Sequence, residues 1–145
     1  MSLSESTITT VKATIPVLRA HAVDITSRMY ENLFEKYPHT RSLFGAAPED
    51  QPNILAAAIT AYAVNIDNLD SLSEAVSRMA SAHVRTNVRP EHYPMVADAL
   101  LSAMEDVLGE AATPEILNAW EEAYFFLAEI LIEEERARYA RSNTA

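Results

Sequence analysis

His83 continues the apolar face of a predicted helix, and its imidazole is a side chain that can bind a metal ion or exchange a proton. The same face carries Leu72, Ala75, Val76 and Met79, which recur at intervals of three and four residues. An imidazole among aliphatic side chains needs a hydrogen-bond partner, an opposite charge or a metal ion. His83 is therefore either a metal ligand or a core histidine whose ring nitrogens are satisfied by protein groups.

Two further polar side chains, Tyr93 and Glu135, are expected on the inward faces of the last two helices. Tyr93 opens the apolar series after Pro90, and the inward series of the last helix comprises Trp120, Tyr124, Leu127, Leu131 and Glu135. If Glu135 meets His83 and Tyr93, it accepts hydrogen bonds from both, which fixes the imidazole tautomer and strengthens it as a ligand. The alternative is that Glu135 belongs to a solvated charge cluster, EEER.

Tyr30 and Gln51 are polar side chains at inward positions on two earlier helices. Both can donate a hydrogen bond to a small ligand, although Tyr30 could also be a core tyrosine bonded to a backbone carbonyl. We expect the dry slot around them to be formed by Phe44, Leu55, Ile59 and Val96.

A single inward histidine limits the kind of metal site. The sequence contains no cysteine and no acidic cluster at the spacing of a zinc or calcium site. One axial histidine in an apolar pocket suits haem, because the porphyrin supplies the other four nitrogens. The other histidines, His21, His39 and His92, are expected at the surface.

Helices are the elements that must position these residues. We predict helices from Ser4 or Ser6 through Leu18, from Asp24 to Tyr37, from Pro52 to about Leu69, from Ser71 to just past His83, from Pro90 to Gly109, and from Pro114 into the EEER run. Pro16 should bend the first helix, and Gln51 should lie at or near the cap of the third. Ser71 and Glu74 are spaced as a capping box.

Composition favours one helical domain and excludes several functions. The chain has 145 residues, of which 49% are hydrophobic and only two are glycine. A formal net charge of -10 disfavours binding to nucleic acid or to anionic lipid. There is no membrane-spanning apolar run and no secretory signal, so we expect a cytoplasmic protein.

The sequence resembles the globins, and more narrowly the single-domain bacterial haemoglobins and the globin part of flavohaemoglobins. The order of predicted elements is that of a globin, and the matching stretches follow in family order over nearly the whole chain. They are VKATIP from Val11, MYENLFEKYP from Met29, LFG from Leu43, DQP from Asp50, AYAVNIDNL from Ala61, RPEHYPMV from Arg89, LNAWEEAYFFLA from Leu117 and EEERARY ending at Tyr139. The resemblance implies an all-α globin fold in one domain, residues 1–145, with a fourth helix that is short or missing.

The resemblance also implies a role for each candidate residue. His83 matches the proximal iron ligand, Tyr93 and Glu135 the proximal hydrogen-bonding pair, and Tyr30 and Gln51 the distal pair that acts on bound ligand. The side chains that it places around the haem are His83, Phe44, Leu55, Ile59, Met79, Arg85, Val88, Tyr93, Val96 and Tyr124.

Three positions depart from the family pattern. The loop Gly45 to Glu49 is short, and Pro52 directly follows Gln51, so the glutamine lies at the mouth of a helix. Ala82 precedes the expected ligand where flavohaemoglobins often have lysine, and Arg85 is the expected substitute as a propionate partner. The sequence ends at Ala145, so we expect no reductase domain of the kind that flavohaemoglobins carry.

The function that the resemblance implies is reversible binding of dioxygen by haem b. Nitric oxide and carbon monoxide are further expected ligands, and nitric oxide meeting the oxygenated form should give nitrate and ferric haem. Sustained turnover would then need a separate reductase. A globin-shaped sensor or interaction module without haem and a peroxidase-like haem enzyme are the alternatives, and the chain is either a monomer or a homodimer.

Overall fold

The computed structural model describes residues 3–44, 50–86 and 88–144, and it contains helices and no strand within them. The α-helices are α1 (Glu5–Ala13), α2 (Ile15–Lys36), α3 (Gln51–Val64), α4 (Ser73–Arg85), α5 (His92–Leu108) and α6 (Pro114–Thr144). Short 3₁₀ helices are η1 (Pro38–Phe44), η2 (Leu69–Leu72) and η3 (Gly109–Ala111). The expected all-α architecture is confirmed, whereas the loop Gly45 to Glu49 lies outside the described residues.

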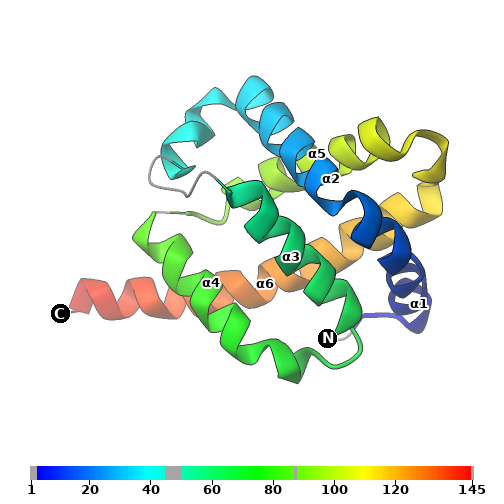
Figure 1. Ribbon diagram of the computed structural model, residues 1–145. Helices are drawn as coiled ribbons and strands as arrows, with labels where there is room; N and C mark the ends of the chain where they lie inside the picture. Colours follow the sequence, from blue (N-terminus) through cyan, green and yellow to red (C-terminus); the bar gives the residue numbers. More distant parts are fainter. Residues whose placement is uncertain (1–2, 45–49, 87, 145) are drawn as a thin grey trace.

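The helices pack in two groups that share one core. α2 packs against α3 and α5, and α6 packs against α1, α4 and α5. Figure 1 shows the long α6 passing behind α3 and α4, which cross the front of the molecule. The main core holds the apolar faces of α2, α5 and α6, including the fully buried Leu33, Ala103 and Ala123. No helix of the described residues is both long enough and apolar enough to cross a membrane.

The first helix is shorter than predicted, because it ends at Ala13 and Thr14 separates it from the next helix. Pro16 has no N–H to continue the hydrogen-bond ladder, but its fixed backbone angle suits the first turn of a new helix. The Thr14 hydroxyl donates to the carbonyl of Val11 at 2.6 Å and accepts from the indole nitrogen of Trp120 at 3.1 Å. The expected second helix therefore begins at Ile15, and the predicted start at residue 24 is wrong.

Two boundaries around α3 and α4 also differ from the prediction. α3 ends at Val64, because Asn65 leaves the helical conformation at φ of -107° and ψ of 17°. The side-chain amide of Asn65 donates to the carbonyl of Ala61 and caps this end. The predicted capping box of Ser71 is wrong, since its hydroxyl donates to the carbonyl of Asn68 at 2.7 Å within η2. α4 accordingly begins two residues later, at Ser73.

The ends of α5 and α6 follow local sequence rules. α5 begins at His92, two residues after the predicted start at Pro90. Gly109 ends it with φ of 57°, a conformation that strains any residue with a Cβ atom. The Thr113 hydroxyl then accepts from the backbone N–H of Ile116 at 3.2 Å, which confirms the predicted cap of α6.

Candidate functional site

His83, Tyr93 and Glu135, which were predicted to meet, do so from three different helices. Nδ1 of His83, on α4, lies 2.8 Å from Oε2 of Glu135 on α6 and 3.0 Å from the hydroxyl oxygen of Tyr93 on α5. The Tyr93 hydroxyl donates to the same carboxylate, at 2.8 Å to Oε1 and 2.7 Å to Oε2. Glu135 is only 3% exposed. The alternative of a solvated Glu135 is therefore wrong.

The chemistry of this cluster determines which nitrogen of His83 carries the proton. A carboxylate only accepts hydrogen bonds, so Nδ1 of His83 must carry a hydrogen to satisfy Glu135. Nε2 then keeps its lone pair, which is the form of imidazole that binds a metal. Burial, and next the hydrogen bond to Glu135, raise the pKa of Tyr93, so its hydroxyl remains a donor. The cluster thus presents one electron-rich imidazole nitrogen.

The two polar side chains predicted on α2 and α3 also meet. The amide nitrogen of Gln51 donates to the hydroxyl oxygen of Tyr30 at 3.2 Å, which leaves the phenol hydrogen available to another acceptor. Burial raises the pKa of Tyr30, while the bond from Gln51 lowers it less, so the phenol stays protonated at neutral pH. Phe44 packs edge-on against the Tyr30 ring, with centroids 5.2 Å apart.

A hydroxyl on the same face of α2 anchors the start of α3. Thr26 is fully buried, lies one turn before Tyr30, and donates from Oγ1 to the carbonyl of Pro52 at 2.7 Å. This bond holds the first turn of α3 against α2, directly beside Gln51. Thr26 and Tyr30 are four residues apart and so share a face of α2, but no local sequence pattern indicates that the Thr26 hydroxyl bonds to Pro52.

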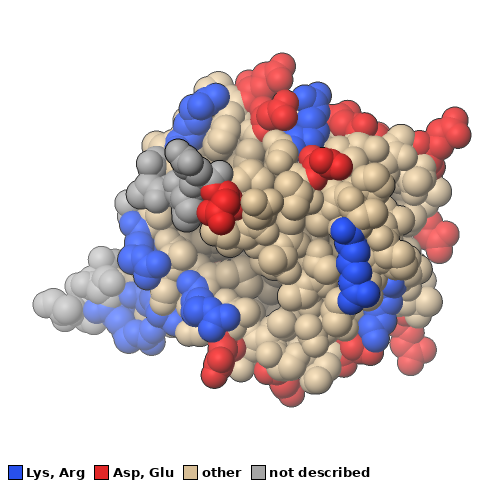
Figure 2. Space-filling view, in the orientation of Figure 1, with Lys and Arg blue, Asp and Glu red and all other residues tan. Residues whose placement is uncertain are grey.

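The apolar side chains predicted around the haem are partly buried. Phe44, Leu55, Ile59, Met79 and Val96 are partly buried and pack against the core, so each keeps an exposed portion. The face seen in Figure 2 is hollowed where α3 and α4 pass each other, and basic side chains lie on the α4 side of the hollow. The side chain of His83 is 32% exposed. The arrangement suits a flat apolar ligand with an iron atom.

The remaining predicted site residues lie around the His83 cluster. Tyr124 donates from its hydroxyl to the carbonyl of Tyr93 at 2.9 Å, and Val88 packs in the same small core as Tyr93. Arg85 is exposed at the last position of α4. Tyr139, whose sequence position suggested no contact, donates to the carbonyl of Val88 at 2.8 Å and so holds the turn after α4.

The other histidines are placed away from this cluster. His21 and His39 are exposed, as predicted, whereas His92 is half-buried and its Nδ1 accepts from the backbone N–H of Arg89 at 2.8 Å. His92 therefore serves the turn before α5. Among the described residues, no three histidine, aspartate or glutamate side chains gather as a metal site. A metal at His83 must bring most of its ligands with it.

Comparison with known proteins places this geometry in a family. A sequence profile described as globin matches residues 27–131. An uncharacterised globin-like protein of Aquifex aeolicus is 53% identical over 139 residues, covering 96% of this chain and 99% of that protein. The chain also matches flavohemoproteins, of which it spans about a third, for example 34% of one from Xylella fastidiosa at 47% identity.

Solved structures also match this chain over nearly its whole length. A candidate nitric oxide dioxygenase of Rhodothermus marinus, engineered as a carbene transferase, superimposes with a TM-score of 0.95 at 46% identity, covering 98% of this chain and 99% of that one. A flavohemoglobin of Malassezia yamatoensis, solved with bound FAD and heme, gives 0.82 at 29% identity and covers 97% of this chain and 38% of that one.

Proposed function

This chain belongs to the globin family, and we propose that it holds haem b through His83 and binds dioxygen reversibly at the haem iron. The observation that carries the proposal is the pairing of two polar clusters on different helices. One cluster, on α4, α5 and α6, presents a single metal-binding nitrogen, and the other, on α2 and α3, presents a free phenol hydrogen.

The residues present fit haem. His83 offers one neutral imidazole, and a porphyrin would supply the other four nitrogens that this site lacks. Leu55, Ile59 and Val96 are partly buried apolar side chains suited to the porphyrin faces, and the exposed Arg85 suits a propionate. When bound, ferrous haem supplies the iron at which dioxygen, nitric oxide and carbon monoxide bind and at which nitric oxide is oxidised to nitrate.

The proximal residues would make His83 a strong ligand. Glu135 accepts from Nδ1 of His83 and gives the imidazole partial anionic character, while Tyr93 holds the carboxylate in place. Because Glu135 is buried, these bonds act in a medium where charge is weakly screened. A strongly donating histidine favours reaction of bound oxygen as well as simple storage.

The distal residues would stabilise the partial negative charge of bound dioxygen. Tyr30 keeps its proton and already accepts from Gln51, so the phenol hydrogen is directed to a further acceptor. Donation from Gln51 also polarises the phenol, which strengthens its own hydrogen bond. A charge-assisted bond of this kind slows release of the ligand.

Oxidation of nitric oxide is the reaction that we propose for the oxygenated protein. The support is the match to flavohemoproteins and to the candidate dioxygenase of Rhodothermus marinus. Haem held by His83 would supply the iron for this oxidation, and repeated turnover would need one electron from a donor for each nitrate formed. We propose that a reductase supplies this electron.

Absorption spectroscopy tests the proposal. The purified chain, supplemented with haem, should give an intense Soret band, and the reduced form should shift on addition of carbon monoxide. Stopped-flow mixing of the oxygenated protein with nitric oxide should then yield nitrate in equal amount. Absence of any Soret band after haem addition would favour a haem-free sensor or interaction module instead.

A further inference from the structure

An arginine one turn beyond Glu135 connects α6 to the helix that carries His83. Nη1 of Arg138 donates to the hydroxyl of Ser81 at 2.8 Å, and Nη2 donates to the hydroxyl of Ser77 at 2.9 Å. Nη2 also lies 3.2 Å from Oε1 of Glu134 on its own helix. The Arg138 side chain is only 24% exposed. One guanidinium thus spans two successive turns of α4.

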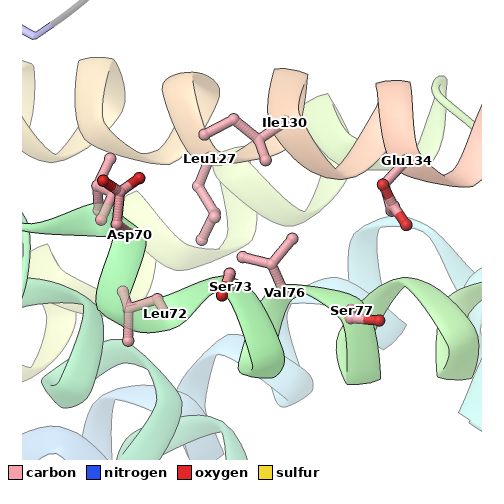
Figure 3. A pocket seen from close by; sticks show the side chains of 9 residues that line it. Asp70, Leu72, Ser73, Val76, Ser77, Leu127, Ile130 and Glu134 are labelled. Atoms are coloured by element: carbon pink, nitrogen blue, oxygen red, sulfur yellow. The ribbon is translucent and has the colours of Figure 1, made fainter.

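Apolar side chains pack between α4 and α6 along part of the two helices. Ala80 of α4 packs with Ala128 and Leu131 of α6, and Val76 and Met79 pack against the same cluster. A half-open cavity of about 310 Å³ lies between the two helices toward the start of α4. Figure 3 shows this cavity, with Val76 and Leu127 facing each other across it. The cavity leaves part of α4 without close apolar packing on α6, and the polar contacts of Arg138 add to the packing that holds the helix.

The geometry links the Arg138 contacts to the His83 contact. Glu135 and Arg138 are three residues apart on α6, so they lie on neighbouring positions of one face, and Ser81 and His83 lie within one turn of α4. A single turn of helix is stiff, so a shift of α4 along α6 changes both contacts together. Nε of Arg138 is buried without a partner, so the guanidinium is placed by its two Nη groups alone.

We propose that Arg138 is a positioning residue, which fixes α4 against α6 so that Nδ1 of His83 meets Glu135. The inference rests on the proposed function only in that His83 is taken as the iron ligand. Arg138 touches neither haem nor ligand in this role. It acts by keeping the hydrogen bond that makes the imidazole electron-rich.

Replacing Arg138 with alanine tests the proposal, with Arg136→Ala as the matched control. Arg136 lies on the same last part of α6, is 69% exposed and pairs only with Glu133 among the contacts of the described residues. Resonance Raman spectra of the reduced, haem-loaded chain report the iron–histidine stretch, which falls in frequency when the imidazole loses anionic character. We expect this frequency to fall in Arg138→Ala and to stay unchanged in Arg136→Ala. Arg138→Lys should give an intermediate fall, because an ammonium cannot bridge two turns as a fork.

Two further variants separate positioning from general destabilisation. Ser77→Ala with Ser81→Ala removes both hydroxyl acceptors on α4 and leaves only the long contact of 3.5 Å from Nη2 to the carbonyl of Ser77. The pair should lower the frequency of the iron–histidine stretch nearly as Arg138→Ala does, with little further fall when the changes are combined. In a chain that already carries Glu135→Gln, adding Arg138→Ala should not lower the frequency of the iron–histidine stretch any further. The proposal would be overturned if Arg138→Ala lowered the stretching frequency as much in the double serine variant or in Glu135→Gln as in the unsubstituted chain. Equal frequency shifts for Arg136→Ala and Arg138→Ala would also overturn it.

Amide hydrogen exchange gives a readout that does not depend on haem. In the purified chain, with or without haem, the amides of Ala82 and Val84 should exchange roughly tenfold faster in Arg138→Ala, the factor that one charged hydrogen bond typically contributes. Unchanged exchange would contradict the positioning role. If the chain takes up no haem at all, the proposed function fails, and the exchange result alone decides whether Arg138 holds α4.

Discussion

Tyr30→Phe is the variant that tests the distal half of the site most sharply. The substitution removes one oxygen atom and keeps the ring, which is 8% exposed and packs against Phe34 and Phe44. Gln51 loses the acceptor for its amide nitrogen. The apolar walls of the slot stay in place, so a change in ligand release reports on the hydroxyl.

The expected magnitude follows from the hydrogen bond that the phenol would make. Tyr30 already accepts from Gln51 and keeps its proton, so it is a competent donor to a partly negative ligand. A hydrogen bond to a charged group contributes about 1.5–3 kcal/mol. Loss of that bond should speed oxygen dissociation by roughly tenfold to 150-fold. The release of carbon monoxide should change less, because bound carbon monoxide carries less negative charge.

Stopped-flow replacement of oxygen by carbon monoxide measures the dissociation rate directly. Tyr37→Phe is the control, because Tyr37 also loses a hydroxyl, which donates to Asp98 at 3.0 Å near the surface, and should leave the rate unchanged. Equal oxygen dissociation rates for Tyr30→Phe and the unsubstituted protein would refute the reasoning. The phenol hydrogen would then be directed away from the ligand.

Three other substitutions test the remaining contacts. Glu135→Gln should raise the ferric/ferrous midpoint potential in spectroelectrochemical titration, because a less anionic imidazole stabilises ferric iron less; an unchanged potential would contradict the proximal role. Thr26→Val should lower the free energy of unfolding by about 1–2 kcal/mol and speed oxygen release, because the bond that anchors Pro52 is lost. The control Thr60→Val removes only a bond to its own helix, and equal effects of the two changes would argue against the anchor. The pKa of Tyr93 is raised in the folded state, so its contribution to stability is complete below its unfolded pKa of about 10 and is lost as the pH rises further. Urea unfolding should show this alkaline loss, which should be smaller in Tyr93→Phe.

Side-chain periodicity predicted the core of the site well. The inward series of the last helix ends at Glu135 and so placed a carboxylate on an inward face. A buried carboxylate requires hydrogen-bond donors. His83 and Tyr93 were the inward donors on other helices, so their meeting followed from hydrogen-bond chemistry. The pattern left open whether Glu135 was solvated, because that depends on how far α4 covers the end of α6.

Helix boundaries and contacts between helices were predicted less well. The break at Thr14 depends on a hydroxyl that is shared between Val11 and Trp120, which lies 106 residues away in the sequence. The contact from Arg138 to α4 was missed for a similar reason. An arginine near the end of a charged helix usually faces water, and only the packing of α4 brings Ser81 within its reach.

The central claim is that Nε2 of His83 holds the iron, and the spectrum of His83→Ala tests it most directly. The reduced variant, with and without carbon monoxide, should lose the spectrum of a histidine-ligated haem protein, and added imidazole should restore it. A variant that keeps the unsubstituted spectrum and oxygen affinity without imidazole would show that another atom binds the iron.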